Sequence, residues 1–203
     1  MKNELEASSI QVRFEHLLKL IRSERFLKMQ GLGNEVPFFI CPFSPEETVD
    51  FKRIQKQLKN KLEENGVRVL AINLYDLAIE LLKARGIWQQ VMDMEKTTPK
   101  EEIKELLQNV LDSEAHLIPA ISDKMKNQDF DVMFIGGVGE VFPYIRSHNV
   151  LNNLQKTAKN HPTVMFFPGT YIHSIEGGVS LNLFNRLHDD KYYRAFNIFH
   201  CEI

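Results

Sequence analysis

The segment with the clearest potential for chemistry is a glycine-rich turn between a predicted strand and a predicted helix, FIGGVGEVFPYIRSHNVLNNL (134–154). Such a turn can cradle a phosphate, because its backbone amides and the N-terminus of the following helix attract anions. Gly137 and Gly139 supply the first two glycines of the dinucleotide-binding pattern, but Phe142 stands in place of the third, and Glu140 adds a negative charge. The pattern therefore favours glycines that let the backbone bend at the end of a strand.

The start of another predicted helix also argues against a phosphate site. The P-loop pattern GxxxxGK[ST] is absent from the chain. The first predicted strand is followed instead by Ser44-Pro45-Glu46-Glu47, which places two carboxylates and a proline without an N–H where a phosphate would bind. We therefore expect this helix N-terminus to be filled by its own side chains.

A run of polar side chains follows the glycine turn, just beyond the strand end where α/β folds place their ligand crevice. The segment LHDDKYYRAF (187–196) adds tyrosine and arginine, residue types that are enriched in interface hot spots. A solvated helix surface and tyrosine rings that cap the sheet edge remain the alternatives. The candidate partner- or ligand-binding residues are Gly137, Gly139, Glu140, Tyr144, Arg146, His148, Asn149, Asn152, Tyr192 and Arg194.

Other reactive side chains form no recognisable site. Ser147 and His148 are neighbours on a predicted helix and point about 100° apart, so adjacency does not make them a nucleophile and base pair. Cys41 lies in an apolar strand, where a thiol is normally inert. The consecutive residues 200–202, His-Cys-Glu, would face opposite sides of a strand and could not chelate a metal together. The sequence assigns no catalytic residue, metal ligand or cofactor.

The elements that must position these residues alternate between helix and strand. Buried strands are predicted at 36–43, 67–73, 131–137 and 163–169, with two short strands at 180–184 and 194–199. Helices are predicted at 10–29, 44–65, 74–85, 98–111, 113–126 and 143–158. This alternation predicts an α/β fold with a mainly parallel sheet of five or six strands, helices on both faces and at least one antiparallel edge strand. The fold would be P-loop-like or Rossmann-like, without a phosphate-binding loop.

The bulk composition narrows the class of protein. The 203 residues, 43% of them hydrophobic, suffice for one domain over 1–203. Lys and Arg number 25 against 27 Asp and Glu, so no global charge attracts nucleic acid or an anionic membrane. The chain has no uninterrupted apolar run of about 18 residues, and its two cysteines form no metal-binding or disulfide pattern. We expect a cytoplasmic protein.

Six blocks along the chain resemble the BrxB family, a small conserved component of the bacterial BREX phage-defence system. In order they are GLGNEVPFFI, NLYDLAIELL, HLIPAI, GVGEVFPYIRSHNVLNNLQ, FFPGTY and DDKYYRAF. The resemblance implies a part in host DNA methylation and phage exclusion, with the alkaline-phosphatase-like component PglZ as partner and the BREX methyltransferase and ATPase components as further candidates. It supplies no catalytic residues.

Two functions are therefore in competition. The first is a non-catalytic adaptor that presents the helix after the glycine turn to a protein partner. The second is a nucleotide- or nucleic-acid-binding subunit that uses the crevice beyond the turn at 136–139, with Arg146 and Arg194 as phosphate contacts.

Overall fold

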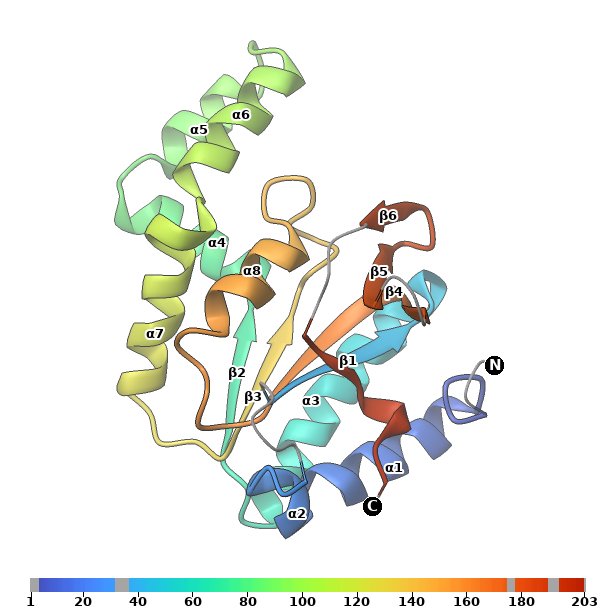
Figure 1. The fold of residues 1–203 in the computed structure, drawn as a ribbon. Helices are drawn as coiled ribbons and strands as arrows, with labels where there is room; N and C mark the ends of the chain where they lie inside the picture. Colours follow the sequence, from blue (N-terminus) through green and yellow to red (C-terminus); the bar gives the residue numbers. More distant parts are fainter. Residues whose placement is uncertain (1–3, 32–36, 175–177, 190–193, 203) are drawn as a thin grey trace.

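A central, mainly parallel sheet organises the chain (Figure 1). The structure is a computed structural model that describes residues 4–31, 37–174, 178–189 and 194–202. Five parallel strands stand in the order β2-β3-β4-β1-β7. Their bounds are Phe38–Phe43 for β1, Val69–Asn73 for β2, Val132–Gly136 for β3, Thr163–Ser174 for β4 and Phe196–Asn197 for β7. This order differs from the order 3-2-1-4-5-6 of the dinucleotide-binding fold.

The sheet continues as an antiparallel extension beyond the parallel part. Strand β4 runs on past Pro168 and pairs with β5 (Gly178–Leu183), which in turn pairs with β6 (Leu187–Asp189). The expected antiparallel edge is thus confirmed, although β6 lies between the two short strands predicted at 180–184 and 194–199 and was not itself predicted. The last predicted strand, 194–199, is reduced to the two residues of β7, which pair in parallel with β1.

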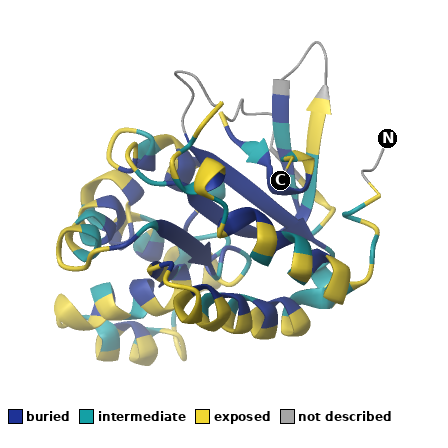
Figure 2. Cartoon of the chain, turned by 90° about the horizontal axis from the view of Figure 1, so that it is seen from below, coloured by how far each residue is buried: buried dark blue, intermediate teal, exposed yellow. Residues whose placement is uncertain are grey.

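Helices cover both faces of the sheet, as the sequence predicts. One face packs against α1 (Ile10–Ile21), α2 (Glu24–Leu27) and α3 (Thr48–Glu64). The other packs against α4 (Leu74–Ala84), α5 (Trp88–Met94), α6 (Lys100–Val110), α7 (Ile118–Lys126) and α8 (Ser147–Leu154). Short helical turns complete the chain: η1 (Pro45–Glu47), η2 (Ser113–Leu117) and η3 (Ile198–His200). Figure 2 shows the parallel part of the sheet as buried ribbons, while the end of β4 and the outer faces of the helices are exposed.

Side chains that alternate along each strand build the two cores. In β1, Phe38 and Ile40 face α4–α8, whereas Phe39 and Cys41 face α1–α3. All six residues of β1 are buried, which explains why the segment reads as a continuous apolar run instead of an alternating one.

Two helices begin or end at positions that the sequence did not predict. The first predicted helix is divided, because the Ser23 side chain accepts a hydrogen bond from Phe26 N at 3.2 Å and starts α2 separately. The helix predicted from 143 begins at Ser147, since the Tyr144 and Ile145 amides both donate to Val141 O in a turn.

A long helical insertion separates β2 from β3. Helices α5 and α6 extend away from the sheet, and η2 leads back into α7 (Figure 1). Pro119 lies in the first turn of α7, where its missing N–H costs no helical hydrogen bond. Among the described residues, no helix is both long enough and apolar enough to cross a membrane.

Candidate functional site

The strand order places the crevice of the fold at the carboxyl ends of β1 and β4. From β1 the chain continues to β2 on one side, whereas from β4 it continues through β5 and β6 to β7 on the other. In open α/β sheets, ligands bind beyond the strand ends at such a divergence. The residues at this position therefore decide whether the fold keeps a ligand site.

An internal ion pair occupies the first part of the crevice, where η1 and α3 follow β1. Arg13 is only 4% exposed, and its Nη1 donates to Glu47 Oε2 at 3.0 Å while Nη2 donates to Glu47 Oε1. The Ser44 N–H also donates to Glu47 Oε2, at 3.2 Å, and the Ser44 hydroxyl donates to the Glu46 carboxylate. The carboxylates expected from the sequence thus occupy the anion position at this helix start.

The electrostatics of this corner keep Glu47 charged. The hydrogen bonds from Arg13 hold the pKa of the Glu47 carboxyl below its usual value, against the opposing effect of partial burial. The cavity that remains beside Arg13, Ser44 and Glu47 has a volume of about 130 Å³. Pockets for small organic ligands measure roughly 300–1,000 Å³, so this cavity is too small for a nucleotide.

The glycine turn follows β3, and it packs against the start of α4 at the neighbouring carboxyl end of β2. Gly137 has a φ of +74°, and a Cβ there would fall on the side-chain amide of Asn73, 3.0 Å from its Cγ. The Asn73 Oδ1 is needed in that place, because it accepts hydrogen bonds from Tyr75 N at 2.9 Å and Asp76 N at 3.3 Å and so caps α4. The space above Gly137 therefore holds a helix cap.

Gly139 makes room for an aromatic ring. A Cβ at this position would lie 2.8 Å from Phe184 Cε1 and 2.9 Å from Pro168 Cγ. The ring of Phe184 also meets Phe142 edge-on, at 6.5 Å between centroids. Phe184 and Asn185 both have positive φ, at 56° and 57°, in the turn between β5 and β6. The β5–β6 turn thus packs directly on the glycine turn.

Three residues that the sequence reasoning missed carry this arrangement: Arg13, Asn73 and Phe184. Asn73 carried a usable signal, since an asparagine directly before a helical pattern is a preferred N-cap. Arg13 and Phe184 come from α1 and from the hairpin, far from the crevice in sequence, so their placement required the fold.

Helix α8 presents part of the predicted polar surface. Arg146, Asn149 and Asn152 are exposed and recur every three residues, so they share the outer face of the helix. His148 is different: it is only 3% exposed and lies on the face of α8 that packs on the core with Leu151. The expectation that His148 belongs to an exposed run is wrong, because its position three residues before Leu151 places it on the inner face of the helix.

The other candidate residues do not all join this surface. Glu140 forms an ion pair with Lys52 on α3, at 3.0 Å between Lys52 Nζ and Glu140 Oε2, and so belongs to the opposite side of the sheet. Tyr144 is half-buried against the core, and Arg194 is exposed beside β7. Tyr192 lies outside the described residues.

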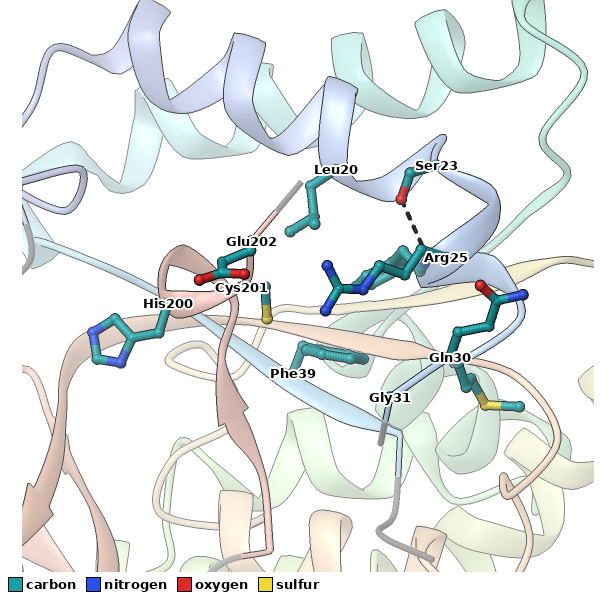
Figure 3. A pocket seen from close by; sticks show the side chains of 11 residues that line it. Leu20, Ser23, Arg25, Gln30, Gly31, Phe39, His200, Cys201 and Glu202 are labelled. Carbon is teal, nitrogen blue, oxygen red and sulfur yellow. Dashed lines mark hydrogen bonds between the residues drawn. The ribbon is translucent and has the colours of Figure 1, made fainter. Parts of the chain in front are cut away.

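A separate cavity of about 290 Å³ lies at the amino end of β1, away from the crevice (Figure 3). Figure 3 shows the Arg25 side chain reaching toward Cys201, while the His200 ring points away. Burial raises the pKa of the Cys201 thiol to about 11, which leaves it protonated at neutral pH. Among the described residues, no three His, Cys, Asp or Glu side chains gather as metal ligands.

The fold and the crevice together define a class: an α/β protein with a parallel sheet, in which internal side chains occupy the places where related folds bind phosphate. The family model described as "BREX protein BrxB" matches residues 70–198. The chain is 35% identical over 196 residues to the BREX protein BrxB of Bacillus cereus (strain H3081.97), covering 93% of this chain and 97% of the Bacillus protein. It belongs to the BrxB family of the BREX phage-defence system.

A second relative extends the family match to a distant bacterium. The BREX protein BrxB of Escherichia coli O9:H4 (strain HS) is 27% identical over 189 residues, covering 93% of this chain and 91% of its own length. No solved structure matches the chain.

Proposed function

We propose that this protein is a non-catalytic adaptor subunit of a cytoplasmic BREX complex, in which it binds PglZ and supports host DNA methylation and phage exclusion. Membership in the BrxB family supports a role beside other BREX components. The observation that carries the adaptor role is the ion pair of Arg13 and Glu47, which fills the anion position at the carboxyl end of β1. Binding would then use the outer surface of the protein.

The surface proposed for PglZ is the outer face of α8. Arg146 offers a fork of donors for a carboxylate, and the amides of Asn149 and Asn152 can donate and accept hydrogen bonds. Arginine is enriched at interface hot spots, and a rigid helix holds these three side chains in fixed register. The buried partners of α8, Val150 and Leu154, fix the helix on the sheet.

The test is co-purification of PglZ with the double variant Arg146→Glu/Asn149→Ala. Both positions are exposed, and a carboxylate at the start of α8 agrees with the helix dipole, so thermal unfolding should be unchanged. We expect recovery of PglZ to fall by about tenfold or more, and phage plating to rise in cells that carry the variant. The matched control is Arg53→Glu, which makes the same charge change on α3, on the opposite face of the sheet.

Two results would contradict the proposal. Unchanged recovery of PglZ with the double variant would remove the α8 surface from the interaction, and equal loss with Arg53→Glu would show a nonspecific charge effect. The nucleotide alternative has its own assay, because a nucleotide or short DNA at about 100 times its dissociation constant should stabilise the protein by roughly 2.7 kcal/mol. Such a stabilisation would favour a nucleotide- or nucleic-acid-binding function in the crevice.

A further inference from the structure

The open edge of strand β2 forms a groove that the proposed adaptor surface does not use. Within the part of the chain that the structure describes, β2 pairs with β3 and with no other strand. The carbonyl of Arg68 accepts a hydrogen bond from Val132 N of β3, so the next carbonyl, that of Val69, points away from β3, where Gln128 Nε2 donates to it at 3.5 Å. In a parallel strand, alternate residues direct both backbone groups to the same side. Ala71 therefore directs its N–H and C=O outward as well, and it is exposed.

Helices α3 and α4, which Figure 1 shows beside the sheet, pack on opposite faces of it. Their side chains form the two walls of this groove. The cavity has a volume of about 720 Å³; Ala71, Ile72 and Phe134 line it, and it reaches Gly136 and Glu140 at the glycine turn. It is larger than the cavities beside Glu47 and Cys201. Its size and the exposed outward N–H and C=O of Ala71 suit an extended segment of polypeptide.

The two walls carry opposite charges. The α3 wall contributes three lysines, one of which is paired with Glu140 of the glycine turn, and the α4 wall contributes two carboxylates, one of which is paired with a lysine of α7. These residues are Lys52, Lys56 and Lys59 on α3, Asp76 and Glu80 on α4, and Lys124 on α7. Among the described residues, Lys56 has no ion-pair partner. The pairs that do exist, such as Lys124 with Glu80 at 2.7 Å, are partly exposed and contribute little, so a ligand can replace them.

We propose that the β2 edge binds an extended segment of a partner protein in which acidic and basic side chains alternate. A strand added to β2 directs successive side chains to opposite faces of the sheet. Its acidic residues would meet the lysines of α3, and its basic residues would meet Asp76 and Glu80 on α4. The spacings agree, because lysines one helical turn apart are roughly 5–6 Å from each other and same-face strand residues are roughly 6.6–6.8 Å apart.

Two simpler explanations of the groove fit it less well. Lysines often guard an edge strand against aggregation, but this role does not account for the acidic wall on the other face. A second copy of the chain could pair β2 with β2 about a two-fold axis perpendicular to the sheet. That arrangement would bring the lysine row of one α3 against the same row of the other, which is repulsive.

The probe is a capped, fluorescein-labelled octapeptide that alternates Glu and Lys, titrated against the full chain. The comparison peptide has the same composition with all Glu before all Lys. We expect the alternating peptide to bind about tenfold or more tightly than the block peptide. On binding, the Ala71 amide should shift in the NMR spectrum and become protected from hydrogen exchange.

Variants of the walls and of the strand complete the test. Lys56→Glu/Lys59→Glu should weaken binding by about tenfold or more. Lys61→Glu, a charge reversal on α3 outside the groove, should leave binding within about twofold. Ala71→Pro removes the outward N–H at an edge position that tolerates proline, and should abolish binding.

Several outcomes would overturn the proposal. They are no binding at millimolar peptide, equal binding of the two peptides, or equal effects of the groove and control lysines. Sedimentation analysis tests whether a second copy of the chain occupies the edge. A dimer of the wild-type protein that the Ala71→Pro substitution dissociates would assign the edge to that second copy. The charge variants keep the test decisive even if Ala71→Pro does not fold.

Discussion

Replacing Gly137 with alanine tests whether the glycine turn serves as packing for a helix cap. The substitution introduces two costs. The first is the left-handed backbone, since a φ of +74° costs a residue with a Cβ about 1–2 kcal/mol. The second is the new Cβ, which would displace the Asn73 side chain and leave the amides at the start of α4 without their cap, at about 1 kcal/mol.

Gly66→Ala is the matched control. Gly66 ends α3 with a φ of +82°, and a Cβ there would meet nothing within 4 Å. Both substitutions therefore share the left-handed strain and the reduced entropy of the unfolded chain. Urea unfolding should show Gly137→Ala to be less stable than Gly66→Ala by about 1 kcal/mol, the contribution of the displaced cap.

A double-mutant cycle with Asn73→Ala isolates the contact itself. Once the asparagine side chain is absent, the Cβ at position 137 has less to displace, so the two losses should not add. We expect the double variant to be about 1 kcal/mol more stable than the sum of the single effects predicts. Equal stability of Gly137→Ala and Gly66→Ala, together with additivity in the cycle, would refute this account of the turn.

Two further predictions concern buried ionisable groups. Arg13→Met should lower the free energy of unfolding by about 2 kcal/mol at pH 7, because it removes charged hydrogen bonds to Glu47. The folded-state pKa of Glu47 lies below its unfolded value, so the stabilisation exists above the unfolded pKa and is lost as the pH falls. In urea titrations, the difference in unfolding free energy between Arg13→Met and wild type should therefore be smaller at pH 3 than at pH 7. In thiol labelling of the native protein, Cys201 should react slowly at neutral pH. Its labelling rate should rise about tenfold for each pH unit as the pH approaches its pKa of about 11. Cys41 is fully buried and should stay unlabelled until the protein unfolds.

The sequence predicted those parts of the fold that local pattern controls. The continuous apolar run of β1, the helix start at Ser44 and Pro45 and the helix end at Gly66 all lie where turn chemistry and burial place them. The end of the chain was harder, because 194–199 reads as a strand from its apolar residues. There the Asn197 side chain accepts a hydrogen bond from Phe199 N at 3.0 Å, which turns the backbone into η3 after two paired residues.

The candidate site was predictable only in its outline. The sequence indicated a glycine turn without phosphate chemistry and a polar helix after it. It could not show that the space near the turn is filled by Asn73 and by Phe184, since those contacts join segments far apart in the chain. It also placed His148 outside, although helical periodicity puts this residue on the same face as Leu151, which the core buries.

The packing of the loop between the glycine turn and α8 links stability to the proposed function. Val138, Val141 and Ile145 in this loop are each at most 3% exposed, and the Pro143 carbonyl accepts a hydrogen bond from Gln108 Nε2 on α6 at 3.1 Å. These anchors hold α8 independently of Gly137. Strain at the turn should therefore act on the cap of α4 and leave the outer face of α8 in place. Consequently, folded Gly137→Ala should still bind PglZ, and a loss of binding without unfolding would show that the turn itself belongs to the partner surface.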